Sequence, residues 1–348
     1  MRTVQWNENR NEICLIDQRL LPGRLEIFTC KTLDEVVFAI HDMVVRGAPA
    51  IGATAAYGMA LAACRSSATS VDQLRSELRQ AAQALNNSRP TAVNLTWATR
   101  QMVLFMDQTA GSVSEITERL TVEAQRIADQ DVATNKRMAE VGAELIQDGD
   151  TIIHHCNTGA LAAVDWGTAL GVIRLAHESG KRIHVLVDET RPRLQGARLT
   201  AWELEQLNIS YEIITDNAAG HFLRRHQADK VFFGADRVAA NGDVANKVGS
   251  YMLALAAHAN HVPVYSVFPT STVDLSLDNG DQIPIEERPA AEILDLQFHG
   301  ERVAPEKAKA RNPAFDVTPN HLFTALVTEK GIIHQPLKDN LPRIVRGL

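Results

Sequence analysis

The spacing of hydrophobic residues divides the chain into two parts with different periods. Between Thr32 and about Arg137, apolar residues recur every three or four positions, as in TLDEVVFAIHDMVV and VDQLRSELRQAAQALNN. This is the period of an amphipathic helix. The first 30 or so residues instead form short extended segments interrupted by Pro22 and Gly23. The pattern predicts a mainly helical first part with a small β element at its start.

Beyond Gly149 the pattern changes, because short β-rich runs now alternate with helical stretches. We expect strands at residues 151–155, 182–188, 211–215, 230–236 and 262–267. Alternation of strand and helix is typical of a parallel sheet with right-handed crossovers. The expected fold class is therefore α/β: an N-terminal mainly helical domain over residues 1–130 and a C-terminal Rossmann-like domain over residues 131–348, with a parallel sheet flanked by helices.

Composition and charge narrow the classes of function. With 45% hydrophobic and 22% charged residues, the chain has the composition of an ordinary soluble globular protein. A net charge of −7 argues against nonspecific nucleic-acid binding, which needs a basic surface. A few cations in a pocket can still hold a small phosphorylated ligand.

Cysteine usage and the apolar stretches predict a cytoplasmic location. The four cysteines contain no CxxC pair, and this spacing is typical of reduced thiols. No apolar run follows the first arginine, so we expect no signal peptide. The longest apolar stretch, around residues 53–64, is too short to span a bilayer.

Polar and reactive side chains follow three of the expected strands. In a parallel sheet, ligands bind beyond the carboxyl ends of the strands. Cys156 follows the first expected strand, and Asp188 and Asp236 are the last residues of the second and the fourth. Since these ends share one edge of the sheet, the sequence predicts a site there.

Cys156 and Asp236 are the candidate reactive groups. Cys156 stands between a strand and a helix expected to begin near Gly159, and a helix N-terminus favours a thiolate. It would act as a base or polarise a substrate, whereas the alternative is a small buried residue that fills space. Asp236 follows a strongly apolar strand, and desolvation would raise its pKa toward that of a general acid. Its alternatives are a salt bridge to Arg237 or a turn cap.

Two short segments are candidates for anion binding. Arg46 and Gly47 precede an alanine-rich helix with Pro49 in its first turn, so free N–H groups and a guanidinium meet there. Arg89 stands before a proline in a similar way. Both segments could equally be ordinary helix boundaries. Lys247, at the entrance to a second alanine-rich helix, is either a phosphate or hydroxyl partner or a solvated lysine.

The histidines and glycines predict no metal site and no cofactor. His154 and His155 would point to opposite faces of a strand. His258 and His261 share a helical face but have no carboxylate or cysteine beside them in the sequence. HExxH and GxGxxG are both absent from the sequence.

The motifs, taken in order, resemble those of methylthioribose-1-phosphate isomerases. They extend from about residue 2 to residue 335 and comprise LIDQRLLP, RGAPAIGATAAYG, RPTAVNL, HHCNTGALA, DETRPRLQGARLTAWEL, GADRVAANGDVANKVGSY, IPIEER and NPAFDVTP. The resemblance extends to ribose-1,5-bisphosphate isomerases and to the alpha, beta and delta subunits of a eukaryotic initiation exchange factor. It implies a helical N-terminal domain, a Rossmann-like C-terminal domain and a homodimer.

Residue roles follow from the same resemblance. The catalytic cysteine of the family corresponds to Cys156, and its proton donor corresponds to Asp236. The substrate contacts correspond to Arg46, Gly47, Ala48, Arg89, Gln195, Asn246 and Lys247. The implied reaction converts 5-methylthioribose 1-phosphate to 5-methylthioribulose 1-phosphate in methionine salvage. An isomerase for ribose 1,5-bisphosphate or a 5-deoxyribose 1-phosphate, and a non-catalytic sugar-phosphate-binding regulatory subunit, remain as alternatives.

Overall fold

A computed structural model of the chain describes residues 2–90 and 92–347. Thr91, which belongs to the RPTAVNL segment, lies outside the described residues. Contacts divide the chain into two compact units, a first unit of residues 1–136 with 158–167 and a second unit of residues 137–157 with 168–348. The division falls inside helix α5 (Val113–Gly142), a short way beyond the domain limit expected from the sequence at residues 130 and 131.

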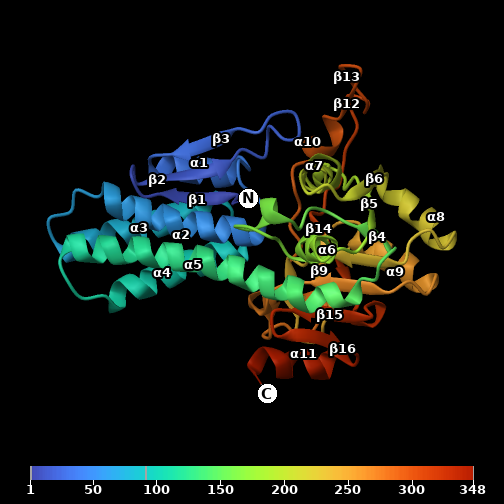
Figure 1. Cartoon of the computed structure of the whole chain (residues 1–348). Helices are drawn as coiled ribbons and strands as arrows, with labels where there is room; N and C mark the ends of the chain where they lie inside the picture. The colour runs from blue at the N-terminus through green and yellow to red at the C-terminus, as the bar shows by residue number, and fades with distance from the viewer. Residues whose placement is uncertain (1, 91, 348) are drawn as a thin grey trace. The chain divides into compact units, whose positions relative to one another are not determined.

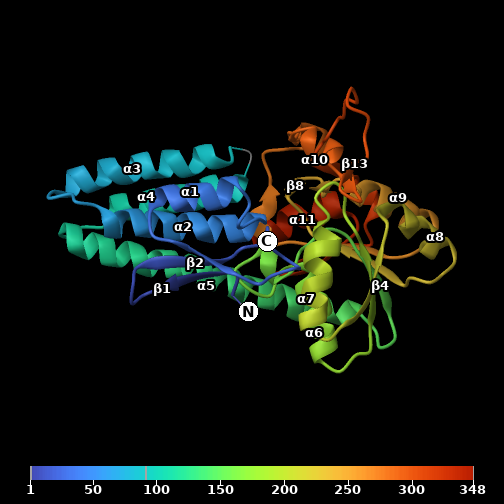
Figure 2. The ribbon, with the colours of Figure 1, turned by 90° about the horizontal axis from the view of Figure 1, so that it is seen from above.

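The first unit combines a helical bundle with a small antiparallel sheet, as the sequence predicts. Its helices, besides the first part of α5, are α1 (Leu33–His41), α2 (Ala48–Arg65), α3 (Val71–Ser88) and α4 (Val93–Gln108). The sheet has the order β1 (Val4–Asn7), β2 (Glu12–Ile16), β3 (Ile27–Cys30). Figure 2 shows α2, α3 and α4 running side by side.

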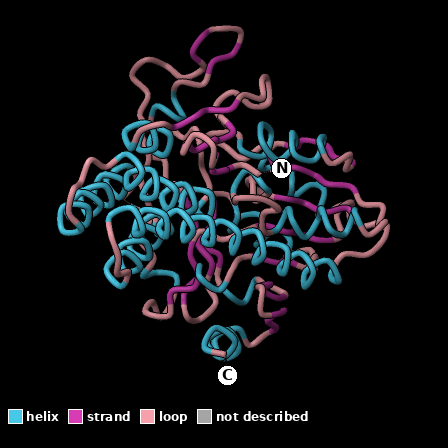
Figure 3. The backbone as a smooth tube through the Cα atoms, turned by 60° about the vertical axis from the view of Figure 1, so that its left-hand side comes forward, coloured by secondary structure: helices cyan, strands magenta, loops and turns pink. Residues whose placement is uncertain are grey.

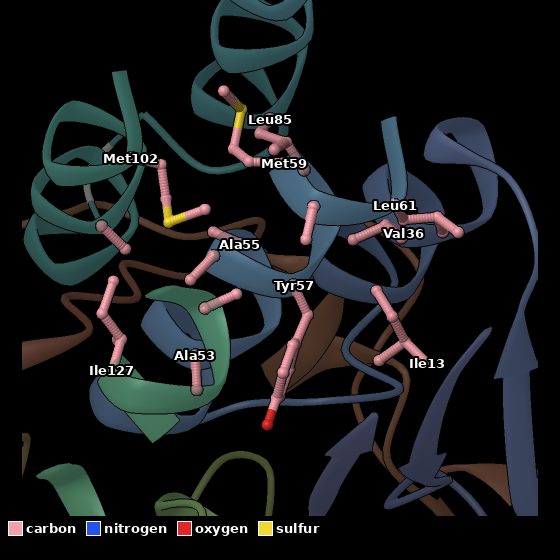
Figure 4. Packing of buried hydrophobic residues seen from close by; sticks show 14 of the residues in the cluster. Ile13, Val36, Ala53, Ala55, Tyr57, Met59, Leu61, Leu85, Met102 and Ile127 are labelled. Atoms are coloured by element: carbon pink, nitrogen blue, oxygen red, sulfur yellow. The ribbon is translucent and has the colours of Figure 1, made fainter. Parts of the chain in front are cut away.

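Helix α2 forms the centre of the first core. It is apolar on nearly every side, and such a helix is stable only when it is surrounded. Its alanines allow close approach of neighbouring helices, while Tyr57 and Met59 fill the larger spaces (Figure 4). The Tyr57 hydroxyl donates a hydrogen bond to Gln125 Oε1 at 2.9 Å, so this buried polar group is paired.

The second unit is built on a seven-stranded sheet that is parallel except at one edge (Figure 1). Its strand order is β16 (Gly331–His334), β15 (Ala325–Thr328), β10 (Val264–Val267), β7 (Lys230–Phe233), β4 (Thr151–His154), β5 (His184–Asp188), β6 (Ser210–Ile214). Only β16 is antiparallel to its neighbour. The five expected strands are thus confirmed, with ends that differ from the expected ones by at most three residues.

Both faces of this sheet are buried, which explains why its strands read as continuous apolar runs. Ile153 packs in the cluster that includes α8 (Ala219–Arg224), α9 (Ser250–Ala259) and α11 (Leu337–Arg346). Ile152 packs in the cluster on the other face, with α6 (Ala169–Glu178) and α7 (Ala201–Gln206). Among the described residues, no helix has both the length and the apolar character needed to cross a membrane.

A second, four-stranded sheet belongs to the same unit and was not expected from the sequence. Figure 3 distinguishes the helices, strands and loops of the chain by colour. Its order is β11 (Val273–Asp274), β8 (Arg237–Ala239), β9 (Val244–Lys247), β14 (Phe315–Thr318). The remaining short elements are α10 (Ala291–Leu294), the hairpin β12 (Gln297–Phe298) and β13 (Glu301–Arg302), and helical turns η1 (Ala143–Leu145), η4 (Asp216–Ala218), η5 (Thr270–Thr272), η6 (Gly280–Gln282) and η7 (Asn320–Leu322). Asn246 and Lys247 therefore lie at the end of strand β9, which is separated from helix α9 by two residues.

Candidate active site at the carboxyl ends of the strands

The strand order brings the candidate reactive groups of the second unit together. Strands β7, β4 and β5 are neighbours and parallel, so the segments after them start from one edge of the sheet. The β8–β9 hairpin returns to this edge, because the Asp236 N–H donates to the Ala245 carbonyl at 2.9 Å. Lys247, two residues further on, interacts electrostatically with both Cys156 and Asp236. A thiol, a carboxyl and an amine from three segments thus share one neighbourhood.

Lys247 is held in an environment that disfavours the charged form of its amine. Burial lowers the pKa of this amine, although Cys156 and Asp236 act in the opposite direction. Its Nζ donates to the Ala314 carbonyl at 2.7 Å and lies 4.8 Å from the centre of the Phe315 ring. Lys247 is therefore not a solvated lysine, which was the alternative considered from the sequence.

The backbone at Cys156 adopts a conformation that residues other than glycine rarely take. Its φ is +67°, in the left-handed region, where strain is about 1–3 kcal/mol. The Cys156 N–H donates to Thr190 Oγ1 at 2.9 Å, and its carbonyl accepts from Thr200 Oγ1 at 2.7 Å. The side chain is nearly buried, with 8% exposed. Two threonines from other segments therefore hold the peptide groups on both sides of this residue.

The expected helix N-terminus beside Cys156 is wrong. Gly159 has an extended conformation and pairs with Gly167 in an isolated antiparallel bridge, which prevents a helix from starting there. Only the three-residue 3-10 turn η2 (Ala160–Ala162) follows, and α6 begins at Ala169. The dipole of an α-helix is consequently not available to favour a thiolate at Cys156.

A buried ion pair lies next to Cys156 in the chain. His155 Nδ1 is 2.8 Å from Asp188 Oδ2, and His155 Nε2 is 3.0 Å from the Val248 carbonyl. Burial lowers the pKa of His155, but the hydrogen bond and charge of Asp188 outweigh it and raise the pKa above its ordinary value. With both ring nitrogens next to acceptors, His155 is best placed as an imidazolium. The preceding His154 is buried and neutral, since burial and His155 lower its pKa to about 3.

His155, Asp188 and Asp216 lie close enough together to be considered as metal ligands. Both ring nitrogens of His155 are hydrogen-bonded, and the Asp216 oxygens accept the N–H groups of Thr190 and Arg191 at 2.7 Å each. Asp188 Oδ1 is buried without a partner among the described residues. Most of the donor atoms are thus engaged within the protein, and the absence of a metal site stays a prediction.

Gln195 and Asn246 present amide groups in the same unit. Gln195 is buried, and its Oε1 has no hydrogen-bond partner within residues 2–90 and 92–347. Gln195 precedes the π-helical segment η3 (Gly196–Thr200). The last residue of this segment, Thr200, donates a hydrogen bond to the Cys156 carbonyl. Asn246 is also buried and donates from Nδ2 to Ser250 Oγ at 2.8 Å. Gln195 therefore offers an acceptor suited to a hydroxyl group.

The predicted anion-binding residues of the first unit pack on the segment that follows the HCNTG motif. Arg46 Nε donates to Gln18 Oε1 at 3.1 Å, and Gln18 Nε2 donates to the Leu161 carbonyl at 2.7 Å. Gly47 caps α2 with φ at +93°, and a Cβ there would lie 2.3 Å from the Ala162 carbonyl oxygen. Only glycine fits this position.

The other two predicted contacts of this unit lie at helix ends. Ala48 is the first residue of α2, with a proline after it, so the N–H groups of its first turn lack partners within the helix. Arg89 is the half-buried C-cap of α3. The α2 boundary retains the features of an anion site, whereas Arg89 closes a helix.

A surface cavity of about 310 Å³ lies elsewhere, beside the antiparallel edge strand of the large sheet. It is lined by Ile332, Ile333, His334, Asn340, Arg343 and Ile344. None of the predicted site residues belongs to it.

Comparison with known proteins agrees with the family resemblance of the sequence motifs over nearly the whole chain. The Initiation factor 2 subunit family matches residues 44–335. Methylthioribose-1-phosphate isomerase 2 of Pseudothermotoga lettingae is 50% identical, over 99% of this chain and 98% of the relative. A methylthioribose-1-phosphate isomerase of Thermotoga neapolitana is also 50% identical, with the same coverage.

Two solved structures are similar over nearly their full lengths. The 5-methylthioribose 1-phosphate isomerase of Pyrococcus horikoshii has a TM-score of 0.93 and 41% identity, covering 100% of this chain and 96% of that chain. An A. fulgidus protein described as translation initiation factor eIF-2B, subunit delta, has a TM-score of 0.90 and 41% identity, with 99% of both chains covered. The fold is thus a helical unit joined to a Rossmann-like unit, and the chain belongs to the Initiation factor 2 subunit family.

Proposed function

We propose that this protein is an aldose–ketose isomerase that converts 5-methylthioribose 1-phosphate to 5-methylthioribulose 1-phosphate, a step of methionine salvage. The observation that carries the proposal is identity of about 50% to relatives named for this activity, over 99% of the chain. The juxtaposition of Cys156, Asp236 and Lys247 at the carboxyl ends of the strands supports it, because it supplies acid–base groups where such folds bind ligands.

The substrate chemistry assigns roles to the two central residues. A phosphate on the anomeric carbon prevents the ring from opening as it does in a free sugar, so an acid must protonate the ring oxygen. Asp236 is the proposed acid. Hydrogen then moves from C2 to C1, with Cys156 as the proposed second group. Lys247, beside both, is the proposed partner of a phosphate or hydroxyl oxygen.

Two routes for the hydrogen transfer remain open. In the first, the Cys156 thiolate removes the C2 proton, and Asp236, now a carboxylate, takes the proton of the C2 hydroxyl and returns it to C1 of the enediol; the Cys156 thiol then restores the proton of Asp236. In the second, hydride passes directly from C2 to C1 while Cys156 stabilises the transition state, and the Asp236 carboxylate takes the proton of the C2 hydroxyl. Turnover in heavy water distinguishes them: deuterium at C1 supports the enediol, and its complete absence supports the shift.

The remaining contacts are proposed from the resemblance and from local geometry. In the second unit these are Gln195, whose buried oxygen is unpartnered, and Asn246. In the first unit they are Arg46, Gly47 and Ala48 at the start of α2, together with Arg89. A guanidinium beside free N–H groups is a common arrangement for holding a phosphate.

The test is direct measurement of turnover on competing substrates. Purified protein should convert 5-methylthioribose 1-phosphate to the ketose, detected by NMR, with kcat/KM at least ~10-fold above that for ribose 1,5-bisphosphate, since a missing or mispaired group is worth a factor of this size or more. A preference for the bisphosphate or for 5-deoxyribose 1-phosphate would replace the substrate assignment. Cys156→Ser supplies the matched inactive control.

A regulatory subunit is the second candidate function, because one structure of 41% identity is described as an initiation factor subunit. Presence of both Cys156 and Asp236 favours the enzyme, since a module that only binds has no need of both groups. Absence of turnover on all three sugar phosphates, with binding retained in calorimetry, would support the regulatory function.

Location and assembly are proposals of the same kind. A cytoplasmic location fits the proposed metabolic role, and a homodimer is what the family resemblance implies. Light scattering of the purified protein measures the assembly, and fractionation of the source cell measures the location.

A further inference from the structure

Two buried hydroxyl groups act on one residue of the candidate site. Thr190 Oγ1 accepts the N–H of Cys156 at 2.9 Å, and Thr200 Oγ1 donates to the carbonyl of Cys156 at 2.7 Å. Both threonines are 0% exposed. They belong to different segments, one directly after β5 and one at the end of η3. A thiol residue in a left-handed conformation is therefore held from both of its peptide groups.

Each hydroxyl is itself fixed in orientation. Thr190 Oγ1 donates to the Asp188 carbonyl at 2.9 Å, so its single hydrogen is directed away from Cys156 and a lone pair is directed toward it. Thr200 Oγ1 accepts from Asn157 Nδ2 at 3.1 Å while it donates to Cys156. The roles of donor and acceptor are thus assigned by the network.

The segment that carries Thr190 is anchored in its turn. The Thr190 N–H donates to Asp216 Oδ1 at 2.7 Å, and Thr190 also has a left-handed φ of +62°. Gly196, a few residues later, packs so tightly on the end of β5 that a Cβ would lie 1.7 Å from the Asp188 carbonyl oxygen. The hydroxyl is therefore presented by a rigid loop and not by a mobile one.

We propose that Thr190 and Thr200, here called the threonine clamp, are positioning residues that keep Cys156 left-handed and thereby fix the direction of its thiol. The inference rests on the proposed role of Cys156 in isomerisation. Without the hydroxyls the backbone at Cys156 can relax toward the extended region that L-residues prefer, and the direction of its Cβ changes with it. Neither threonine needs to touch the substrate.

The experiment compares valine with serine at both positions. Thr190→Val and Thr200→Val remove the hydroxyl at similar volume, and Thr190→Ser and Thr200→Ser keep it. Each valine variant should lower kcat by ~10–100-fold, the size expected when a reacting group is displaced by up to about 1 Å, and leave KM within ~3-fold of the parent. The serine variants should retain kcat within ~3-fold, because the hydrogen bonds persist.

A second readout does not depend on turnover. Iodoacetamide alkylation of Cys156, followed by mass spectrometry of its peptide, gives a rate against pH in the absence of substrate. The profiles of the valine variants should be displaced from the parent, and those of the serine variants should superimpose on it. Valine variants that behave like the parent in both readouts, or serine variants as impaired as valine ones, would overturn the proposal.

The catalytic role of Cys156 and the positioning role of the threonine clamp would be disproved by different results. If Cys156→Ser keeps full turnover, the catalytic role of the thiol is lost, whereas the alkylation profiles still test the clamp. Circular dichroism and thermal melting establish that each variant is folded. If Thr190→Val does not fold, Thr200→Val with its serine partner carries the same comparison, because Thr200 acts independently on the carbonyl side of Cys156.

Discussion

Two turns of the chain contain four of the nine predicted site residues, and the two turns are held by different forces. Around Cys156 in the second unit, side-chain hydroxyls and carboxylates hold the backbone through directed hydrogen bonds. Around Gly47 in the first unit, the backbone of Ala162 approaches so closely that any side chain is excluded. Single hydrogen-bonding groups around Cys156 can therefore be replaced one at a time, whereas no side chain can be added at Gly47 without a steric clash.

This difference predicts which measurement each region affects. Replacement of a hydroxyl that holds the peptide groups of Cys156 should change reactivity more than stability, because the surrounding sheet is independently buried on both faces. Replacement of Gly47 should change stability first, since the segment 158–167 must move to accommodate it.

The largest expected effect is therefore at the glycine turn. Gly47→Ala adds a Cβ 2.3 Å from the Ala162 carbonyl oxygen at a φ of +93°, and steric overlap and strain together should destabilise folding by about 3 kcal/mol or more. Gly149→Ala is the matched control, because its φ is +94° but nothing lies within 4 Å of a Cβ. It should lose only about 1 kcal/mol. Equal losses in urea denaturation would contradict the steric explanation.

The next largest expected effect is on turnover, at the carboxyl ends of the strands. Asp236→Asn should lower kcat by ~10²-fold or more, because an amide cannot replace a positioned general acid, while substrate binding is kept. Arg46→Ala, in the other region, should mainly raise KM. Steady-state kinetics separate the two outcomes. Unchanged turnover in Asp236→Asn would remove this residue from the mechanism, and a pure kcat effect in Arg46→Ala would remove the phosphate role.

The buried ion pair behind Cys156 should give a pH-dependent loss of stability. The folded-state pKa of His155 is raised, so its contribution is lost as the pH rises through that pKa. Burial raises the pKa of Asp188 to about 6, so the pair also loses its charge as the pH falls through that value. Asp188→Asn should thus cost about 2 kcal/mol or more at pH 7 and less at pH 9. Urea denaturation at both pH values measures this. A difference from the parent that grows with pH would refute the charged pair.

The smallest effect lies at the N-terminal cap of helix α1, which belongs to neither turn. Thr32 caps α1 through a hydrogen bond from the Glu35 N–H, and the Glu35 carboxylate returns to the Thr32 N–H at 3.0 Å. Thr32→Ala should cost about 1 kcal/mol without altering kcat. Thermal melting and turnover of the same sample check both parts. A change in kcat would contradict a purely local capping role for Thr32.

The sequence predicts the parallel sheet and the residues at its strand ends because both depend on local patterns. Apolar runs bounded by helical stretches identify β4, β5 and β7, and the segment after each strand can then be read directly. One local pattern also indicates the second sheet. Asn241-Gly242 between two short β-rich runs is typical of a hairpin turn, and the structure has the hairpin β8–β9 there.

The conformation of Cys156 could not be predicted in this way. Its peptide groups are held by residues 34 and 44 positions away, and no local pattern encodes such contacts. Proximity of Gly159 suggested a helix start, but the glycine pairs with Gly167 in a bridge that depends on tertiary packing. The chemistry of the site follows from short motifs, whereas its geometry follows from contacts distant in the sequence.

The assignment of residues 158–167 to the first unit has a consequence for dissecting the molecule. Thr3 donates to the Val164 carbonyl at 2.8 Å, and Asp131 accepts the Val164 N–H at 2.8 Å, so a fragment ending at residue 136 lacks part of its own interior. A single protease cut or a truncated gene cannot yield two intact halves. To produce the first unit alone, residues 158–167 would have to be joined to residues 1–136. Genetic recombination that exchanges the first unit would likewise have to carry both segments.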